Sequence, residues 1–379
     1  MPTRYSKVIR GKDALQKEIE SEPCLQQAMV QGVDFRTIDV DWHNTPCEGA
    51  VFLGCDFPES IKAEWLMTKG AMIFPRLHGV PYRPFRSKLY TRDELMAGWT
   101  AEKDLSYDKQ IYDHYHSARQ ARPSMLEALA QRIHDHAVDE ALLDLLEGKT
   151  EPGGVKKVVG IMGGHGKSRT DPFFKKVVWI ARELTRRGYF IASGGGPGIM
   201  EAANLGAWLA NAPDELLDQS LAILGRSPIF TSDGYMDRAY EVLELHPDGA
   251  SSLAVPTWFY GHEPTNMFSK HVAKYFSNSI REDGLLAIAL HGVIYAPGSA
   301  GTTQEIFMDA TQNHYGTFDW ISPMIFLGTQ RYCVETMLYP CLKQLAQGRT
   351  YSDMLLCSDS ASEIAQFVCD HPPVKGELK

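Results

Sequence analysis

Three short apolar stretches in the C-terminal half of this 379-residue chain each run into a glycine-rich turn and then into a helical pattern. The turns are Gly163 to Gly166, Gly194 to Gly198, and Pro297 to Thr302. Strands that are apolar on both faces and alternate with helices are typical of parallel sheets. Because crossovers between parallel strands are right-handed, all three turns are predicted to lie at one carboxyl edge of one sheet.

The sequence therefore predicts an α/β fold, with a doubly wound, Rossmann-like parallel sheet in residues 151–379. Asp171 followed by Pro172 indicates a helix start, because Asp caps the first turn and Pro fits the first helical position. Gly188 indicates where that helix ends. The expected strands are Val155–Gly164, Tyr189–Ser193, Ser220–Leu224, Ser251–Pro256, Val293–Ala296 and Pro323–Gly328.

Residues 1–150 are expected to form an N-terminal α/β and helical domain, followed by a linker at residues 151–154. Residues 1 to 40 are expected to be mainly helical, and two apolar strands, Gly49–Phe57 and Ala71–Leu77, flank a further helix. A long helical stretch, residues 106–146, carries four histidines at no recognisable zinc-ligand spacing, which favours solvated helix faces over a metal site. These histidines are His114, His116, His134 and His136.

Composition excludes several classes of function. The net charge of −9 and the lack of a long Lys/Arg run argue against nucleic acid as a partner, although a few local donors can still hold one phosphate. No run of eighteen apolar residues occurs, so no membrane span is expected, and the N-terminus lacks the apolar core of a secretory signal. Seven cysteines without CxxC spacing fit a reducing, cytoplasmic setting.

The glycine turns are candidate phosphate sites. Each leaves backbone N–H groups at a helix N-terminus, where the helix dipole favours an anion. Glycine turns also occur merely to let a helix pack on a strand, but three in one predicted sheet favour a nucleotide site. Neither GxGxxG nor GxxxxGK[ST] is present. The candidate binding residues in the turns are Gly163, Gly164, His165, Gly194, Gly195, Gly196, Gly198, Pro297, Gly298, Ser299, Ala300, Gly301 and Thr302.

The charged residues near these turns each have two interpretations. Glu305 lies in a helix expected to open at Thr302, where it either closes a capping box or faces the ligand. Glu201 likewise either caps its helix or faces the pocket. Arg281 is either a surface charge or a clamp on phosphate. Residues 167–169, Lys-Ser-Arg, are either phosphate ligands or a solvated loop.

Two motifs carry a resemblance to a known family. SGGGPGIMEAANLGA, from Ser193, and PGSAGTTQE, from Pro297, resemble the paired GGG-x-x-G-x-M-(E/G)-x-x and PGGxGTxxE motifs of the LOG family of phosphoribohydrolases, once mislabelled lysine decarboxylases. GHEPTNMF, from Gly261, resembles the EPPNPFV-type stretch of the larger bacterial pyrimidine/purine nucleotide 5′-monophosphate nucleosidases. The likeness covers residues 155–335, and Ser299 stands where the family has the second Gly of PGG.

The resemblance implies hydrolysis of the N-glycosidic bond of a nucleoside 5′-monophosphate, giving free base and ribose 5-phosphate. By motif position the family's catalytic pair is Glu305 and Arg281, with the arginine slightly displaced from the family spacing. The resemblance also implies substrate contacts from Met200, Glu201 and Asn266. It implies no cofactor and no metal, a mononucleotide as the partner, and a homodimer or larger homo-oligomer.

The residues suit that chemistry independently. Cleaving an N-glycosidic bond builds positive charge on the sugar, and a carboxylate near C1′ stabilises this charge and orients or deprotonates water. A lysine decarboxylase would need a pyridoxal phosphate site, which no segment indicates. The alternative is a non-catalytic nucleotide-binding sensor of the same fold. Base preference is not readable, because the apolar candidates Trp258, Phe259, Tyr260, Met267 and Phe268 are as suited to the core as to stacking.

Overall fold

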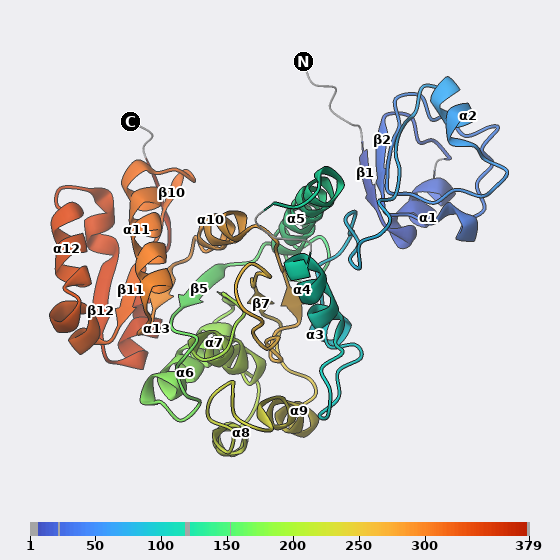
Figure 1. The fold of residues 1–379 in the computed structure, drawn as a ribbon. Helices are drawn as coiled ribbons and strands as arrows, with labels where there is room; N and C mark the ends of the chain where they lie inside the picture. The colour runs from blue at the N-terminus through green and yellow to red at the C-terminus, as the bar shows by residue number, and fades with distance from the viewer. Residues whose placement is uncertain (1–6, 22, 118–121, 152, 377–379) are drawn as a thin grey trace. The chain divides into compact units, whose positions relative to one another are not determined.

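The chain divides into two units, and each is described by itself (Figure 1). The first unit comprises Met1–Leu89 and Asp113–Asp144, and the second comprises Tyr90–Tyr112 and Leu145–Lys379. These units differ from the predicted division after residue 150 in two respects: the segment Tyr90–Tyr112, early in the chain, belongs with the second unit, and that unit resumes at Leu145. The computed structural model describes residues 7–21, 23–117, 122–151 and 153–376, so Pro152 of the expected linker lies outside the described residues.

The first unit is a four-stranded parallel sheet with helices packed on it. Its elements are β1 (Lys7–Arg10), α1 (Lys12–Ser21), β2 (Ala28–Gln31), η1 (Phe35–Thr37), β3 (Val51–Leu53), α2 (Ala63–Thr68), β4 (Met72–Phe74), part of α4 (Tyr107–Ser117), and α5 (Met125–Leu146). The strands pair in the order β1-β2-β3-β4. Their apolar side chains, with Leu15 from α1 and Leu66 from α2, form a separate core.

The strand–helix–strand pattern expected from Gly49 to Leu77 is confirmed by β3, α2 and β4. The helical expectation for residues 1 to 40 is only partly right, because β1 and β2 lie on either side of α1. Each of these two strands has four residues, and they pair with each other, while β2 also pairs with β3. Such pairing is a tertiary effect that a four-residue pattern does not reveal.

The second unit contains a seven-stranded parallel sheet. Its strands are β5 (Val158–Met162), β6 (Phe190–Ser193), β7 (Leu253–Ala254), β8 (His271–Val272), β9 (Val293–Tyr295), β11 (Met324–Leu327) and β12 (Leu355–Ser358). They lie in the order β12-β11-β9-β5-β6-β7-β8, and all neighbours pair in parallel. The chain runs outward from β5 to β8, returns to β9 on the other side of β5, and continues to β12. This order confirms the predicted doubly wound sheet and places the switch point between β5 and β9.

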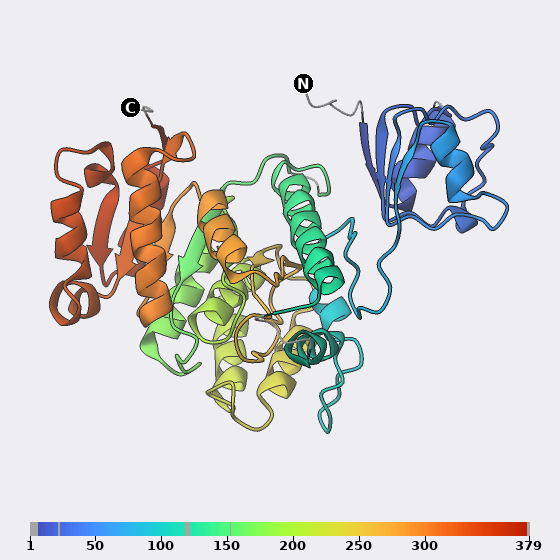
Figure 2. The ribbon, with the colours of Figure 1, turned by 45° about the horizontal axis from the view of Figure 1, so that its top comes forward.

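Helices cover both faces of this sheet (Figures 1 and 2). Apolar side chains from α6, α7 and α13 join one core cluster on one face, while α10 and α11 pack together on the other. The remaining bounds are α3 (Arg92–Leu95), α6 (Pro172–Arg186), α7 (Ile199–Trp208), α8 (Asp214–Gly225), α9 (Tyr235–Leu245), α10 (Asn278–Ile288), α11 (Ala300–Tyr315), β10 (Trp320–Ile321), η2 (Gln330–Glu335), α12 (Leu338–Leu345), η3 (Thr350–Met354), α13 (Ala361–Asp370) and β13 (Val374–Lys375).

The start of α6 is as predicted. Asp171 Oδ1 accepts a hydrogen bond from the backbone N–H of Phe173 at 2.8 Å, and Pro172 occupies the first helical position. In contrast, the strand expected at Ser220–Leu224 is wrong, because these residues belong to α8. Leu217, Ser220 and Leu224 are the buried positions of that helix, and their spacing of three and four residues is helical.

Of the four histidines interpreted as solvated, His136 is exposed, His114 and His116 are half-buried, and His134 is buried. The His134 side chain is fully buried, and its Nδ1 lies 3.1 Å from Oδ1 of the equally buried Asp135. Within the residues that the structure describes, no group of three or more His, Cys, Asp or Glu is placed to hold a metal ion. Among the described helices, none combines the length and apolarity that crossing a membrane requires.

Candidate functional site

The three glycine turns meet at the carboxyl ends of three adjacent strands, β6, β5 and β9. Their backbones are in direct contact. The N–H of Gly164 donates to the carbonyl oxygen of Pro297 at 3.2 Å, and the N–H of Ile199 donates to the carbonyl oxygen of Gly164 at 3.3 Å. The first turn therefore joins the second and third turns at the switch point, where sheets of this kind bind ligands.

Glycine is required where these backbones approach one another. Gly198 has φ of +68°, and a Cβ there would lie 2.6 Å from the carbonyl oxygen of Gly164. A Cβ on Gly194 would overlap Nη2 of Arg281 and lie 2.6 Å from Sδ of Met200. In the third turn, a Cβ on Gly298 would overlap Oγ1 of Thr302. Side chains are therefore excluded at these three positions, where the turns pack closely against their neighbours.

The third turn differs from its prediction in two respects. Helix α11 begins at Ala300, one residue after Ser299, so Glu305 lies in the second turn of the helix rather than the first. The expected capping box is not formed, because the N-cap is Ser299 and no side chain caps the helix there. Ser299 has φ of −113°, a value that any residue adopts, so the position does not depend on glycine.

Two residues that the sequence did not indicate donate hydrogen bonds to the backbone at the third turn. Nη2 of Arg331 donates to the carbonyl oxygen of Gly298 at 2.8 Å, and the Tyr332 hydroxyl donates to the carbonyl oxygen of Ala296 at 2.8 Å. Both residues belong to η2, a π-helix that follows β11. π-Helical turns often occur at functional sites, but nothing in the letters of this segment marks one.

Arg281 and Glu305, the predicted catalytic pair, are brought together. Nη1 of Arg281, on α10, lies 3.7 Å from Oε1 of Glu305, on α11, and the two side chains are 11% and 12% exposed. Nε of Arg281 donates to the carbonyl oxygen of Val255 at 2.8 Å, and Nη2 donates to that of Gly194 at 3.3 Å. The guanidinium is therefore fixed at the carboxyl edge, beside the second turn.

Burial raises the pKa of Glu305 to about 7, the positive charge of Arg281 lowers it, and the nearby Glu282 raises it. Glu282 itself accepts a hydrogen bond from Nε2 of Gln304 at 2.7 Å. One turn further along α11, burial also raises the pKa of Asp309 to about 7, and the Tyr295 hydroxyl donates to its Oδ2 at 2.8 Å. The helix thus carries two carboxyls that titrate near neutrality.

Glu201 does not have either of its expected roles. Its Oε2 accepts hydrogen bonds from Nε of Arg169 and from the Tyr235 hydroxyl, both at 2.8 Å, and its Oε1 pairs with Nη2 of Arg169. Arg169 and Glu201 are each 3% exposed. Arg169 is therefore neither a phosphate ligand nor part of a solvated loop, and Glu201 neither caps α7 nor reaches a ligand.

The hydrogen bonds of the Asn266 side chain are also made within the protein. Its Nδ2 donates to the carbonyl oxygen of Met200 at 3.2 Å and to Oδ1 of Asn204 at 2.9 Å, and its Oδ1 accepts from the N–H of Phe268. The side chain is fully engaged in holding α7, whose start forms the second turn. Met200 remains beside Gly194, as the contact of its Sδ with an added Cβ indicates.

The other residues considered for the site are partly at the surface and partly in the core. His165 is exposed after the first turn, and its ring centroid is 6.1 Å from that of Phe230. Nζ of Lys167 lies 3.2 Å from Oδ2 of Asp171. Trp258, Met267 and Phe268 are buried in the core, whereas Phe259 and Tyr260 are exposed.

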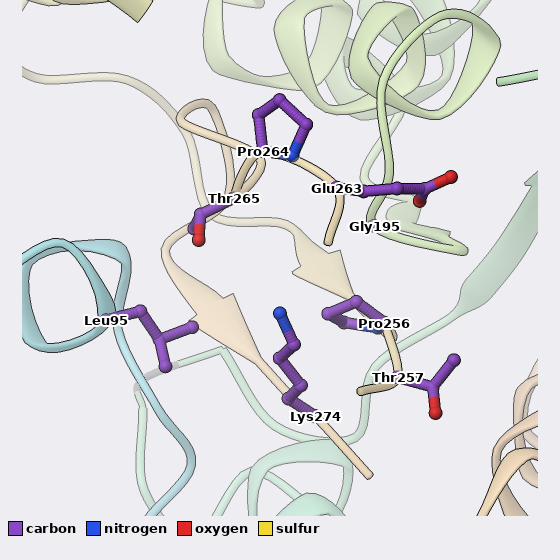
Figure 3. A pocket seen from close by; sticks show the side chains of 8 residues that line it. All are labelled: Leu95, Gly195, Pro256, Thr257, Glu263, Pro264, Thr265 and Lys274. Carbon is purple, nitrogen blue, oxygen red and sulfur yellow. The ribbon is translucent and has the colours of Figure 1, made fainter. Parts of the chain in front are cut away.

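Sequence reasoning also missed Glu263, which lies within the motif GHEPTNMF. Its Oε2 lies 2.5 Å from where a Cβ on Gly196 would stand, and burial raises its pKa. Glu263 lines a small pocket of about 10 Å³, room for about one water molecule, together with Gly195, Pro256 and Lys274. Figure 3 shows its carboxylate pointing away from the Lys274 ammonium. Its only sequence signal is the place of that motif between two predicted strands.

Several solved structures share part of the fold. A molybdenum cofactor carrier protein from Chlamydomonas reinhardtii is similar over 57% of this chain and 97% of its own, at 14% identity and a TM-score of 0.36. A molybdenum cofactor binding protein from Rippkaea orientalis is similar over 57% and 96%, at 13% identity and a TM-score of 0.36. The protein TM1055 is similar over 56% and 99%, at 16% identity and a TM-score of 0.34.

No protein-family model matches the chain, and no curated protein matches it by sequence. At the identities and TM-scores of the solved structures, the likeness carries no inference about ligand or activity. The chain's Rossmann-like, doubly wound α/β architecture rests on its own strand order.

Proposed function

We propose that this protein hydrolyses the N-glycosidic bond of nucleoside 5′-monophosphates, releasing the free base and ribose 5-phosphate. One observation carries the proposal: the Arg281–Glu305 pair lies at the edge of the sheet where three glycine turns meet. An anion site made of backbone amides and a buried carboxylate are the two groups that such a reaction needs.

In the proposed reaction the 5′-phosphate binds to the amides of the turns, which places the sugar beside Glu305. As the bond from C1′ to the base nitrogen breaks, positive charge develops on the ring, and the carboxylate stabilises it. Glu305 accepts a proton from the attacking water, whose oxygen bonds to C1′. The departing base nitrogen takes up a proton from solvent, and Glu305 then returns its own proton to solvent, so one water is consumed. A pKa of about 7 suits this general base, because the group is then ready to exchange a proton at neutral pH.

Arg281 has a positioning role in this scheme. Its bonds to the carbonyl oxygens of Val255 and Gly194 fix the guanidinium, so Nη1 faces Glu305 without moving. The fixed charge lowers the pKa of Glu305 against the effect of burial and keeps part of the carboxyl ionised. Arg331 and Tyr332 act similarly on the third turn, since they hold the carbonyl oxygens of Gly298 and of Ala296, which precedes the turn.

A second candidate function is nucleotide binding without hydrolysis. The same pKa of about 7 favours it to a degree, because a protonated Glu305 is a neutral hydrogen-bond donor that holds a ligand without activating water. The two functions differ only in whether base is released after the nucleotide has bound.

The test incubates the protein with AMP, GMP, CMP, UMP and IMP and follows free base by chromatography. Release by the wild type that is lost in Glu305→Gln supports the hydrolase, provided that calorimetry shows the variant still binds the nucleotide. Glu244→Gln, at an exposed carboxylate on α9, is the matched control and should retain activity. Binding across the panel without release of any base overturns hydrolysis and leaves the sensor.

A further inference from the structure

A cavity of about 310 Å³ lies within the second unit. Its volume falls at the lower end of the range typical of small-molecule sites. Three segments form its walls: the stretch from α3 into the start of α4, the loop before α9 with the start of that helix, and the loop that follows Gly261. The lining residues are Met96, Trp99, Asp104, Ser106, Asp108, Phe230, Thr231, Met236, His262, Pro264 and Thr265.

The cavity has flat and adaptable apolar walls. Trp99 and Phe230 contribute aromatic rings, and Met96 and Met236 contribute flexible thioethers. The Trp99 ring stacks on that of Tyr240, with centroids 5.1 Å apart and planes at 26°, which limits its rotation. Walls of this kind suit a planar aromatic ligand better than a flexible one.

The buried charge at the cavity wall, that of Asp108, is already compensated. Asp108 accepts hydrogen bonds from Nε1 of Trp258 at 2.8 Å and from Oγ1 of Thr265 at 2.9 Å, and it pairs with Nζ of Lys274 at 2.7 Å. No Lys or Arg is among the described residues that line the cavity. A phosphate would find no cation there, so the cavity suits a neutral group.

One polar side chain of the wall, His262, has a ring nitrogen that lacks a hydrogen-bond partner among the described residues. Nε2 of His262 is buried and has no hydrogen-bond partner among the described residues, and it lies 4.0 Å from Oδ2 of Asp108. Burial lowers the pKa of His262, so the ring is neutral at neutral pH and offers a donor or an acceptor according to its tautomer. A buried imidazole nitrogen of this kind is costly unless something bonds to it.

The cavity adjoins the glycine turns at two points. Phe230 contacts His165, the residue after Gly164, at a centroid distance of 6.1 Å. Glu263, between the wall residues His262 and Pro264, approaches Gly196 of the second turn. The cavity wall is thus in contact with the first two turns of the phosphate site.

We propose that this cavity is the base subsite, in which Trp99 and Phe230 flank a purine or pyrimidine ring and Nε2 of His262 hydrogen-bonds its edge. The inference rests on the proposed function, since it assigns the base of the nucleotide to one cavity and the phosphate to the turns. Base discrimination then depends on loops outside the motifs that surround Glu305.

The test fills the cavity rather than emptying it. Thr231 is exposed at the cavity rim, so Thr231→Trp adds bulk there without removing a core contact. Because stacking a base contributes ~1–3 kcal/mol, its loss should raise the KM for a mononucleotide about tenfold or more. The inhibition constant of ribose 5-phosphate, which lacks a base, should not change. Thr350→Trp, at an exposed residue of η3, is the matched control.

A second variant, His262→Gln, keeps a polar group but changes its hydrogen bonding, and should alter the ratio of kcat/KM between AMP and CMP. An unchanged KM in Thr231→Trp overturns the inference, and so does free base that inhibits without competing with the nucleotide. Neither result contradicts the proposed hydrolysis itself. If the wild type releases no base, calorimetry of AMP with Thr231→Trp decides the subsite separately: weaker binding supports it, and unchanged binding overturns it.

Discussion

Nη1 of Arg281 stands 3.7 Å from Oε1 of Glu305, and the two groups reach that distance from neighbouring helices at the carboxyl edge of the sheet. Burial and the positive charge of Arg281 act in opposite directions on the same carboxyl, and its pKa comes to about 7. The site is therefore expected to change its charge, and with it its activity, across the range of pH in which cells work.

The first prediction concerns activity against pH. The proposed mechanism uses ionised Glu305, and its pKa is raised from 4.5 to about 7, so kcat/KM should rise with pH and level off above about 7. Below that value it should fall about tenfold per pH unit, as one required deprotonation dictates. Rates of base release from pH 5 to 9 provide the measurement. A profile that is flat between pH 5 and 8 contradicts the assignment of Glu305 as the base.

The second prediction concerns stability against pH. The pKa of buried Asp309 is raised from 3.8 to about 7, so the folded state binds more protons than the unfolded state between those values. The free energy of unfolding should therefore decrease as pH rises from about 4 to 7 and stay level above. Asp309→Asn keeps the size of the side chain and should make the urea-unfolding free energy less dependent on pH. An unchanged slope in the variant means that Asp309 is ionised when folded.

The third prediction concerns the lack of room for a side chain at Gly194, in the second turn. A Cβ on Gly194 overlaps Nη2 of Arg281, so Gly194→Ala should displace the guanidinium and reduce kcat/KM by ~10-fold or more, because misplacement of that order is costly in catalysis. Gly284→Ala is the control, since Gly284 lies on the same helix as Arg281 and its Cβ would meet nothing within 4 Å. That variant should keep activity and gain about 0.5–1 kcal/mol in stability. Equal activities in the two variants exclude the displacement.

The fourth prediction separates Glu201 from the site. Glu201→Gln leaves the buried guanidinium of Arg169 without its carboxylate, so the free energy of unfolding should fall by about 3–5 kcal/mol. In Asp218→Asn, which removes a pair with Lys175 whose side chains are both 68% exposed, the loss should stay within about 1 kcal/mol. Urea unfolding gives both values. A Glu201→Gln protein that is as stable as wild type but fails to bind nucleotide restores Glu201 to the ligand site.

Local features of the sequence predicted much of the fold. The start of α6 follows from Asp171 and Pro172 because capping acts within a few residues, and each glycine turn lies directly after its strand. The strand expected at Ser220–Leu224 failed for the opposite reason, since a five-residue apolar run fits a strand and a helix equally well. The secondary structure of such short apolar runs is determined by the residues against which they pack.

The roles of the two glutamates can be distinguished only by their contacts with residues that are distant in the sequence. Glu201 and Glu305 both follow a glycine turn on a helix, but Glu201 finds Arg169 and Tyr235, while Glu305 finds Arg281. The spacing of residues along the sequence does not reveal partners of this kind. The same limit applies to Arg331, which lies outside the motifs, and to the cavity, whose walls come from the GHEPTNMF segment and from two segments outside the motifs.

The order of the strands has a consequence for how the protein acquires its site during synthesis. β5 lies between β6 and β9, yet more than a hundred residues separate it from β9 along the chain. A nascent chain that has emerged as far as α9 holds two of the three turns, but neither Arg281 nor Glu305. Arg281 and Glu305 therefore emerge from the ribosome after the first two turns, and the three turns can meet only once β9 has paired with β5.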